Sequence, residues 1–308
     1  MDKDLYVVLS AYGLSLPLTI NQIDNKSVWE INDKYFLKKN DEEEKDIEKI
    51  VMINKFLTEQ GIPAVEYIKT VSGEYYVIFE DNIYSLMRKI NGEHIEFINP
   101  FIGDYKNTGY SIGVEMARLH KALKKMGTTA VYESDLMSEL KTQLTNIKTE
   151  NIDIPYEIIN SCLAFENEYN LLPKQLIHRD IQFGNILFEK GRLKCFLDFD
   201  SSQVNARLFD LAYFGQSILF NNNYRDNKFI IQWINFFSSL LHGYNSENIL
   251  YENEIKSIHI FCIILQFSFI SYYLYSEDKR ELVPKRVDLL KWIYANESIF
   301  AFSLSFAN

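Results

Sequence analysis

The stretch from residue 176 to residue 200 constrains the fold of this chain more than any other. Short apolar runs alternate here with polar turns, first in Leu176–Phe188 and again in the run that ends at Asp200. Such alternation is typical of short strands joined by turns. Most of the second part of the chain instead carries apolar residues at helical spacing, most clearly in 112–123 and 255–274. The sequence therefore predicts an α+β protein in which strands and turns interrupt a mainly helical region.

The first ninety residues predict short strands around one helix. Ser27–Lys39 divides into two β-rich runs with Asn32-Asp33 as the turn, and the runs 75–80 and 83–90 are separated by Asp81-Asn82. Between these pairs, the acidic run 41–44 leads into a helix. One face of this helix carries Ile47, Ile50, Val51, Asn54 and Leu57. Gly61 and Pro63 end the helix. We expect two domains, residues 1–90 and 91–308, joined by a short hinge near residues 86–92.

Charge and cysteine content exclude several classes of protein. The 308 residues carry 32 Lys+Arg against 42 Asp+Glu, and a net charge of −10 argues against a general nucleic-acid binder. Cys162, Cys195 and Cys262 are far apart and form no C-x-x-C pair, so neither a disulfide framework nor a zinc site is indicated. The first residues lack the cationic start and apolar run of a signal peptide. We expect reduced thiols and a cytoplasmic protein.

One segment has the composition of a membrane span. Ile258–Tyr275 contains eighteen residues without formal charge, which is the lower limit for a helix that crosses a bilayer. The polar residues His259, Gln266, Ser268 and Ser271 interrupt it. A helix buried in a large domain explains the segment as well, and we expect no membrane partner. A membrane-anchored protein remains an alternative, which partition into detergent would reveal.

Three polar residues in the 176–200 stretch have the spacing of a phosphoryl-transfer site. His178-Arg179-Asp180, with Asn185 five positions after the aspartate, reproduces the H-R-D-x-x-x-x-N catalytic loop of kinases. Asp198 follows thirteen residues later, in an apolar run after a turn. Phosphoryl transfer needs one carboxylate that accepts or orients the proton of the attacking hydroxyl, and Asp180 is the candidate. Mg²⁺ needs oxygen ligands, which Asn185 and Asp198 can supply.

Each of these residues alone has an ordinary explanation. Asp180 could be a turn or cap carboxylate, and Asn185 a loop-capping amide. The joint pattern is much more specific, because the H-x-D, the asparagine, the apolar run, the turn and the final aspartate occur together in the right order. We therefore interpret the pattern as functional geometry.

These motifs resemble those of the aminoglycoside phosphotransferase family, the branch of the kinase-like fold that includes choline, homoserine and methylthioribose kinases. Its members typically read H-G-D-x-x-x-x-N-I-L, then I-D-F or I-D-W with an acid, then D-L-A. This chain has HRDIQFGNILF, FLDFD and then Phe209–Ala212, and the likeness extends more loosely over most of the chain. Arg179 replaces a small residue and Gln182-Phe183 replaces the common His-Pro. These departures leave the positions of the metal ligands and of the general base intact, but they can alter the surface that contacts the substrate nearby.

The resemblance implies how the first domain binds a nucleotide. Tyr35–Lys38 is similar to the family's Y-V-L-K strand, which implies that Lys38 contacts the α- and β-phosphates. The neighbouring Lys39 would then be a solvated strand lysine, since successive strand residues point to opposite faces. The expected carboxylate partner of Lys38 is Glu48, with Glu44 one turn earlier as the alternative.

The segment Met87–Gly92 resembles the hinge of the family. This resemblance implies that the Arg88 carbonyl and the Ile90 amide meet the edge of the adenine. A plain strand end is the alternative interpretation. Met87, Arg88 and Ile90 are thus candidate nucleotide-binding residues together with Lys38 and Glu48.

Two absent motifs distinguish the chain from a protein kinase. No G-x-G-x-x-G precedes the lysine strand, and no A-P-E follows Asp198. Asp210 comes only twelve residues after Asp198, which leaves no room for a long activation segment and indicates a small-molecule substrate. Asp210 resembles the family's D-L-A aspartate, a structural brace of the catalytic loop, and His120 resembles a packed helical histidine. A role for Asp200 as a secondary metal or loop contact is left open.

The resemblance implies a bilobal protein-kinase-like fold, with an antiparallel sheet and one helix in the small lobe and a mainly helical large lobe. It also implies a kinase that transfers the γ-phosphoryl group of ATP or GTP, with Mg²⁺, to a hydroxyl of a small molecule. An antibiotic-modifying enzyme is the first hypothesis, and a metabolic kinase for an amino alcohol, homoserine or a sugar is the second. A non-catalytic nucleotide-binding member is a third, which the intact Asp180, Asn185 and Asp198 oppose.

The helices at the end of the chain suggest what the substrate carries. They contain aromatic residues and acids, which suit a cationic substrate. The aromatic residues are Trp233, Phe236, Phe237, Tyr272, Tyr273, Tyr275 and Trp292, and the acids are Glu277, Asp278, Glu281 and Asp288. The alternative is that the aromatic residues form core and the acids lie on the surface.

Overall fold

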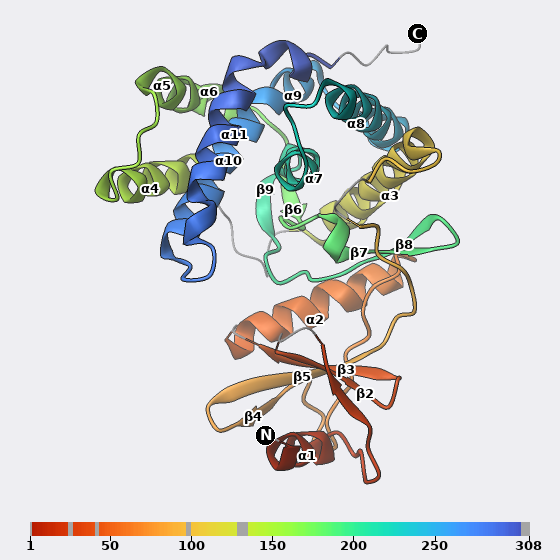
Figure 1. Ribbon diagram of the computed structural model, residues 1–308. Helices are drawn as coiled ribbons and strands as arrows, with labels where there is room; N and C mark the ends of the chain where they lie inside the picture. Colours follow the sequence, from red (N-terminus) through yellow and green to blue (C-terminus); the bar gives the residue numbers. More distant parts are fainter. Residues whose placement is uncertain (1, 24–26, 41–42, 97–99, 128–134, 303–308) are drawn as a thin grey trace. The chain divides into compact units, whose positions relative to one another are not determined.

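The computed structural model describes residues 2–23, 27–40, 43–96, 100–127 and 135–302 (Figure 1). The chain forms two compact units. Unit 1 comprises Met1–Glu93 together with Lys194–Ser201, and unit 2 comprises His94–Leu193 and Ser202–Asn308. Unit 1 therefore ends three residues beyond the boundary expected at residue 90, and it includes a second segment from much later in the chain.

The predicted antiparallel sheet forms the centre of unit 1, with the strand order β1-β2-β3-β5-β4. It has five strands, one more than the four runs that the sequence predicted, because the edge strand β1 was missed. Its strands are β1 (Ile20–Gln22), β2 (Val28–Ile31), β3 (Tyr35–Asn40), β4 (Val77–Phe79) and β5 (Asn82–Arg88). The turn at Asn32-Asp33 is confirmed, since both residues have φ near +55° (53° and 55°) and join β2 to β3. The second turn was predicted one residue too late. Its left-handed residues are Glu80 and Asp81, because Asn82 already pairs with Phe79 in the sheet.

The described residues of unit 1 contain two helices where the sequence predicted one. The predicted helix is α2 (Glu44–Glu59), and every residue expected on its apolar face is buried. Residues 41–42 of the preceding acidic run lie outside the described residues. The helix that the sequence analysis missed is α1 (Asp2–Ala11).

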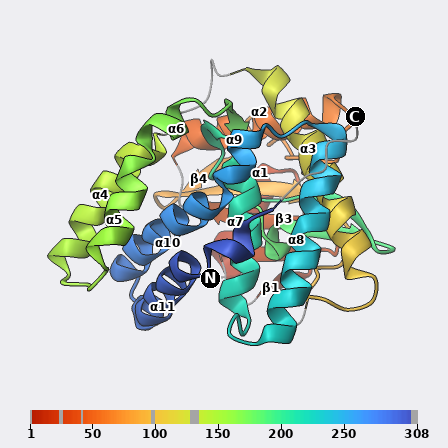
Figure 2. The same cartoon turned by 90° about the horizontal axis from the view of Figure 1, so that it is seen from above.

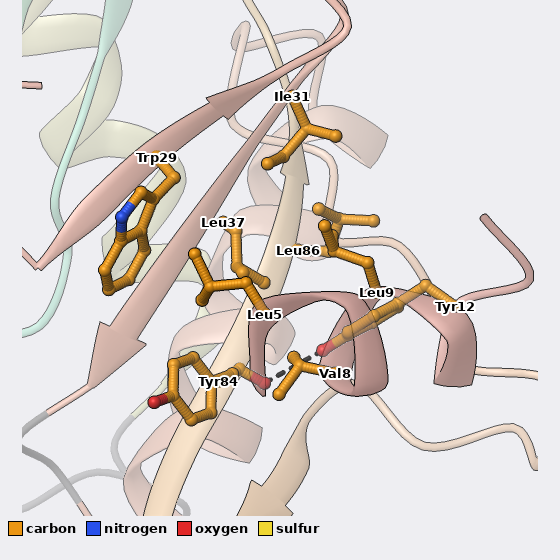
Figure 3. Packing of buried hydrophobic residues seen from close by; sticks show 9 residues of the cluster. All are labelled: Leu5, Val8, Leu9, Tyr12, Trp29, Ile31, Leu37, Tyr84 and Leu86. Atoms are coloured by element: carbon orange, nitrogen blue, oxygen red, sulfur yellow. Dashed lines mark hydrogen bonds between the residues drawn. The ribbon is translucent and has the colours of Figure 1, made fainter. Parts of the chain in front are cut away.

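Helix α1 packs on the sheet through one face (Figure 3). Leu5, Val8 and Leu9 form this face. They lie in one buried cluster with Tyr12, which directly follows the helix, and with Trp29, Ile31, Leu37, Tyr84 and Leu86. The Tyr12 hydroxyl donates a hydrogen bond to the Tyr84 carbonyl oxygen at 2.9 Å. This cluster covers one side of strands β2, β3 and β5, which contain most of the residues that the sequence assigned to nucleotide binding.

Unit 2 is mainly helical, as predicted. Its helices are α3 (Tyr105–Met126), α4 (Leu136–Thr149), α5 (Tyr156–Ala164), α6 (Glu166–Asn170), α7 (Leu208–Asn221), α8 (Asn227–Glu247), α9 (Glu252–Lys256), α10 (Ile258–Tyr275) and α11 (Val283–Ala295), with short 3-10 turns η1 (Phe183–Asn185), η2 (Arg280–Leu282) and η3 (Glu297–Phe300). The 176–200 stretch contains strands as expected, namely most of β6 (Lys174–Ile177) and the hairpin of β7 (Ile186–Glu189) and β8 (Arg192–Phe196), the last three residues of which are counted with unit 1. Strand β6 pairs with β9 (Gln203–Ala206), which follows the stretch.

Helix α10 is the uncharged segment that has the composition of a membrane span. It is long and apolar enough to cross a bilayer, but 61% of the segment is buried inside the structure. It packs against α4, α7 and α11 (Figure 2). A helix that is apolar on all sides suits such a central position in a protein core. The predicted helix 255–274 is divided at Ser257, which separates α9 from α10.

Helices α3 and α8 lie side by side with their backbones in contact (Figure 2). A Cβ atom added to Gly113 would lie 1.9 Å from the Leu240 carbonyl oxygen, and one added to Gly243 would lie 2.0 Å from the Tyr110 carbonyl oxygen. Both neighbours are backbone atoms, so no side-chain movement can make room.

We therefore expect Gly113→Ala to lower the free energy of unfolding by about 3 kcal/mol, because the two helices must move apart. Urea unfolding followed by circular dichroism measures the loss. Lys124→Ala, an exposed change on the same helix, is the control and should stay within about 0.5 kcal/mol of the wild type. Equal stability of the two variants would contradict the contact.

Candidate active site

Asp180 lies in the loop between β6 and η1, and at least three side chains donate hydrogen bonds to its carboxylate. The Tyr213 hydroxyl lies 2.6 Å from Oδ1, the Asn185 amide nitrogen 2.7 Å from Oδ2, and the Gln182 amide nitrogen 3.1 Å from Oδ1. Asp180 is partly exposed, as are these three donors. These three hydrogen bonds fix the orientation of the Asp180 carboxylate at the surface of unit 2.

Asn185 is held by Asp180 in an orientation that leaves its side-chain oxygen as an acceptor. Its amide nitrogen donates both to the Asp180 carboxylate and to the Asp180 backbone carbonyl, at 2.9 Å. An amide group has one oxygen with two lone pairs, and that oxygen takes no part in these bonds. The five-residue spacing seen in the sequence thus makes a fixed pair of side chains.

Asp210 holds the backbone of the loop that contains His178, Arg179 and Asp180. Its buried carboxylate accepts hydrogen bonds from the backbone amides of His178 at 2.9 Å and Arg179 at 2.7 Å, and it lies 2.9 Å from Nε2 of His120. Burial works to raise the pKa of Asp210, but the hydrogen bond and charge of His120 and the interactions with His178 hold it below its usual range. Asp210 is a structural brace and His120 is a packed residue, as the sequence analysis expected.

The backbone conformation at Arg179 is one that a small residue adopts more easily. Its φ is +68°, in the left-handed region that glycine adopts without cost and that a larger residue adopts at a cost of about 1 kcal/mol. The side chain compensates through contacts within unit 2. The guanidinium pairs with Glu139 at 2.8 and 3.2 Å, lies 4.9 Å from the ring centre of Phe209, and donates to Gln203.

Lys38, Asp198 and Asp200 lie together in unit 1. Lys38 is in β3 opposite Ser85 of β5, and its Nζ lies 3.5 Å from Oδ1 of Asp198 and bonds to the Asp200 carboxylate. Asp198 has φ of +63°, and its side chain is 44% exposed. The structure therefore brings together two of the predicted site residues, and it adds Asp200, whose role the sequence left open. The ammonium of Lys38 contacts both acids, and its role in phosphate binding stays a prediction.

The other candidate residues of unit 1 occupy α2 and the end of β5. Glu48 lies on the exposed face of α2, and the alternative Glu44 accepts a hydrogen bond from the Tyr76 hydroxyl. Met87 pairs with Phe36 across β3 and β5.

The strand end itself is held by backbone contacts. The backbone amide of Arg88 donates to the Glu66 carbonyl at 2.8 Å, and the amide of Lys89 donates to the Lys34 carbonyl at 2.9 Å. Ile90 follows directly after these contacts. The roles of Glu48, Met87, Arg88 and Ile90 in nucleotide binding stay predictions.

Asn185 of unit 2 and Asp198 of unit 1 each carry an oxygen donor of the kind that Mg²⁺ prefers. The first offers a neutral amide oxygen and the second an exposed carboxylate, and their role as metal ligands stays a prediction. In the part of the chain that the structure describes, no group of three or more His, Cys, Asp or Glu side chains could hold a metal by itself.

Two residues of the site gave no distinct signal in the sequence. Tyr213 directly follows the D-L-A motif and reaches Asp180 from α7, and Glu139 reaches Arg179 from α4. Both contacts join residues more than thirty positions apart. Cys162, Cys195 and Cys262 are free and buried.

Comparison with known proteins gives a consistent result. The model of the phosphotransferase enzyme family, APH, matches residues 20–244. The solved complex of APH(2")-IIIa with GDP and kanamycin has a TM-score of 0.72 at 12% identity, and the alignment covers 96% of this chain and 99% of that chain. Amicoumacin kinase hAmiN, in complex with AMP-PNP, Ca²⁺ and Ami, has a TM-score of 0.69 at 17% identity, with 93% and 90% covered. No curated protein matches the sequence.

A choline/ethanolamine kinase family protein from Mesorhizobium loti has a TM-score of 0.65 at 14% identity, with 92% of each chain covered. At such low identity, these structures establish the shared fold and leave the substrate open. The family model covers well over half of the chain, including the catalytic loop and Asp198. The chain therefore belongs to the APH phosphotransferase enzyme family.

Proposed function

We propose that this protein is a Mg²⁺-dependent kinase that transfers the γ-phosphoryl group of ATP or GTP to a hydroxyl group of a small molecule in the cytoplasm. The observation that carries the proposal is the hydrogen-bonded carboxylate of Asp180, within a loop that has the family's spacing. Family relatives have been solved with GDP and with AMP-PNP, which supports a nucleotide donor.

Asp180 is the residue that orients the acceptor hydroxyl and accepts its proton. Tyr213 cannot take this role, because burial and the neighbouring Asp180 charge raise the pKa of its hydroxyl above the usual range. Tyr213 therefore stays protonated and donates its hydrogen bond to Asp180. In this arrangement Tyr213, Gln182 and Asn185 hold the carboxylate in place, and the acceptor hydroxyl approaches the carboxylate oxygens.

The remaining residues hold the nucleotide and its metal. Asn185 and Asp198 would supply oxygen ligands to Mg²⁺, which when bound offsets the negative charge of the phosphate oxygens. Lys38 would move from its carboxylate partners to the phosphates. Glu48 would orient Lys38, and the strand end with Met87, Arg88 and Ile90 would hold the base.

The structure describes the residues that suggested a cationic acceptor. Trp233, Phe236 and Phe237 are fully buried in the core, so they cannot line a substrate site. Glu277, Asp278 and Glu281 are exposed. Asp288 is neutralised by Arg225 at 2.6 Å. An antibiotic with several amino groups and a metabolic hydroxy compound are therefore both included in the test.

The test is a coupled assay of ADP and GDP release with Mg²⁺, run against aminoglycosides, choline, homoserine, methylthioribose and simple sugars. We expect release to depend on one class of acceptor and to disappear in the Asp180→Ala protein. Wild-type protein that binds no Mg²⁺-nucleotide would contradict the proposal and favour a non-catalytic member of the fold.

Lys38 and Lys39 form a matched pair for testing nucleotide binding. We expect Lys38→Met to raise the KM for the nucleotide at least about tenfold, because a phosphate-binding charge is lost. Lys39→Met should change it less than about twofold. Steady-state kinetics with varied nucleotide measures both values, and the reverse order would move the assignment by one residue.

A further inference from the structure

Arg286 of α11 is a buried arginine whose hydrogen-bonding groups are mostly unused. Its exposed fraction is 4%, and among the described residues Nε and Nη1 have no hydrogen-bond partner. These two atoms carry three of the five N–H groups of a guanidinium. Nη2 donates to the Tyr273 hydroxyl at 3.0 Å. Buried polar groups in proteins are nearly always paired, so such an arginine calls for a missing acceptor.

Aromatic rings surround this guanidinium. Its central carbon lies 3.3 Å from the ring centre of Phe220 in α7 and 3.9 Å from that of Phe269 in α10. Nζ of Lys285 lies 4.4 Å from the same Phe220 ring. Ring faces attract cations but cannot accept the in-plane N–H groups of the guanidinium as hydrogen bonds.

The positive charge here is not neutralised by the described residues. None of the ion pairs in that part of the chain involves Arg286 or Lys285, and the nearby acid on α11, Asp288, is bonded to Arg225 and Tyr224. Burial lowers the pKa of Arg286, and burial together with the charge of Arg286 lowers that of Lys285.

Arg207 provides a contrast within the same unit. It is 6% exposed, and its guanidinium bonds to the Glu254 carboxylate at 2.8 and 2.6 Å, to Asn248 at 2.7 Å and to the Ile249 carbonyl at 2.6 Å. Arg207 is thus a fully satisfied structural arginine, and Arg286 is not.

Aromatic side chains connect Arg286 to the catalytic carboxylate. The ring centre of Phe269, which stacks on Arg286, lies 5.4 Å from that of Tyr213. The Tyr213 hydroxyl in turn donates to Asp180. Asp180, Tyr213 and Phe269 are all partly exposed, so a small molecule at Asp180 would rest on the rings beside Arg286.

We propose that Arg286 is an acceptor-binding residue and that the acceptor is a hydroxy acid, with its hydroxyl at Asp180 and its carboxylate at Arg286. This inference rests on the proposed kinase function. A carboxylate supplies the missing charge and the missing hydrogen-bond acceptors together, and it forms short, strong bonds with a guanidinium. A single guanidinium between apolar rings suits a compact anion with one negative charge.

The first test needs no knowledge of the acceptor. A buried, unneutralised charge is costly, so Arg286→Met should raise the melting temperature of the ligand-free protein by a few degrees. Arg207→Met is the matched control and should lower it, because it leaves Glu254 buried without a partner. A loss of stability in Arg286→Met equal to that in Arg207→Met would overturn the proposal and make Arg286 structural.

The second test uses pairs of probes that differ in the carboxylate: homoserine and 3-aminopropanol, glycerate and glycerol, 4-hydroxybutyrate and butane-1,4-diol. We expect kcat/KM to be at least about tenfold higher for the acid of the best pair, and Arg286→Gln to remove that preference by raising KM. Arg225→Gln, which changes an exposed arginine, should keep it. Equal use of both members of each pair would overturn the proposal.

If no probe of any pair is phosphorylated, the proposal is tested by the binding of the three acids, measured as a change in melting temperature. A rise in melting temperature with 4-hydroxybutyrate that disappears in Arg286→Gln supports the site, and no rise with any of the three acids overturns it. Failure of the proposed function has a different signature, namely loss of Mg²⁺-nucleotide binding by the wild-type protein. That loss would leave the Arg286→Met result and the binding of the acids unchanged.

Discussion

Replacing Asp180 with asparagine should lower kcat by a factor of about 10²–10⁴ while the affinity for Mg²⁺-nucleotide stays within about threefold. General-base catalysis contributes rate factors of this size, and an amide cannot accept the proton of the acceptor hydroxyl. Asparagine has nearly the same shape as aspartate, so the loop, which Asp210 holds through its backbone, should keep its conformation. Nucleoside diphosphate release measures kcat, and nucleotide titration measures the affinity.

Tyr213→Phe separates the role of the carboxylate from that of its support. This variant keeps Asp180 as the base but removes the 2.6 Å hydrogen bond to Oδ1. We expect a decrease in kcat of about tenfold, clearly smaller than for Asp180→Asn, since one hydrogen bond to a charged group is lost. Equal losses in the two variants would indicate that Tyr213 takes part in proton transfer. Comparable turnover by Asp180→Asn and the wild type would remove Asp180 from its role.

Local patterns in the sequence were sufficient to predict much of unit 1. The turn at Asn32-Asp33 and the buried face of α2 follow from residue types that are close together in the chain. Helix α1 was missed because a ten-residue helix is marginal by itself, and it depends on packing against a sheet whose position the sequence does not reveal. The turn before β5 was misplaced for a related reason. The pairing of Asn82 with Phe79 places the turn at Glu80 and Asp81, although asparagine has a higher propensity for a turn than glutamate.

The residues of the candidate site also fall into two groups, those that a local sequence motif indicates and those that only the packing of distant helices brings together. Asp180, Asn185 and Asp198 could be proposed from the sequence because they have the spacing of a known motif along one continuous segment. Tyr213 and Arg286 were not found, because their proximity arises only when α7, α10 and α11 pack together. An isolated arginine in a helical sequence predicts an exposed residue, and only the burial of Arg286 shows the difference.

Replacing Asp198 with asparagine should lower activity more than about a hundredfold at ordinary Mg²⁺ concentrations and shift half-maximal activity to at least about tenfold higher Mg²⁺. The charge of the metal ligand is lost, and metal binding at phosphates contributes several kcal/mol to the transition state. The backbone should not be disturbed, because asparagine, like aspartate, tolerates the φ of +63° found at this position. A Mg²⁺ titration of nucleoside diphosphate release measures both effects.

Asp200→Asn provides the comparison, because both acids contact Lys38 in the same unit. If Asp200 mainly orients Lys38, the Asp200→Asn change should raise the KM for the nucleotide about tenfold and change the Mg²⁺ dependence little. The more exposed position of Asp198, 44% against 16% for the Asp200 side chain, makes it the better placed of the two to receive a cation from solvent. An unchanged Mg²⁺ requirement in Asp198→Asn, with a shifted one in Asp200→Asn, would transfer the ligand role to Asp200 and leave Asp198 as the partner of Lys38.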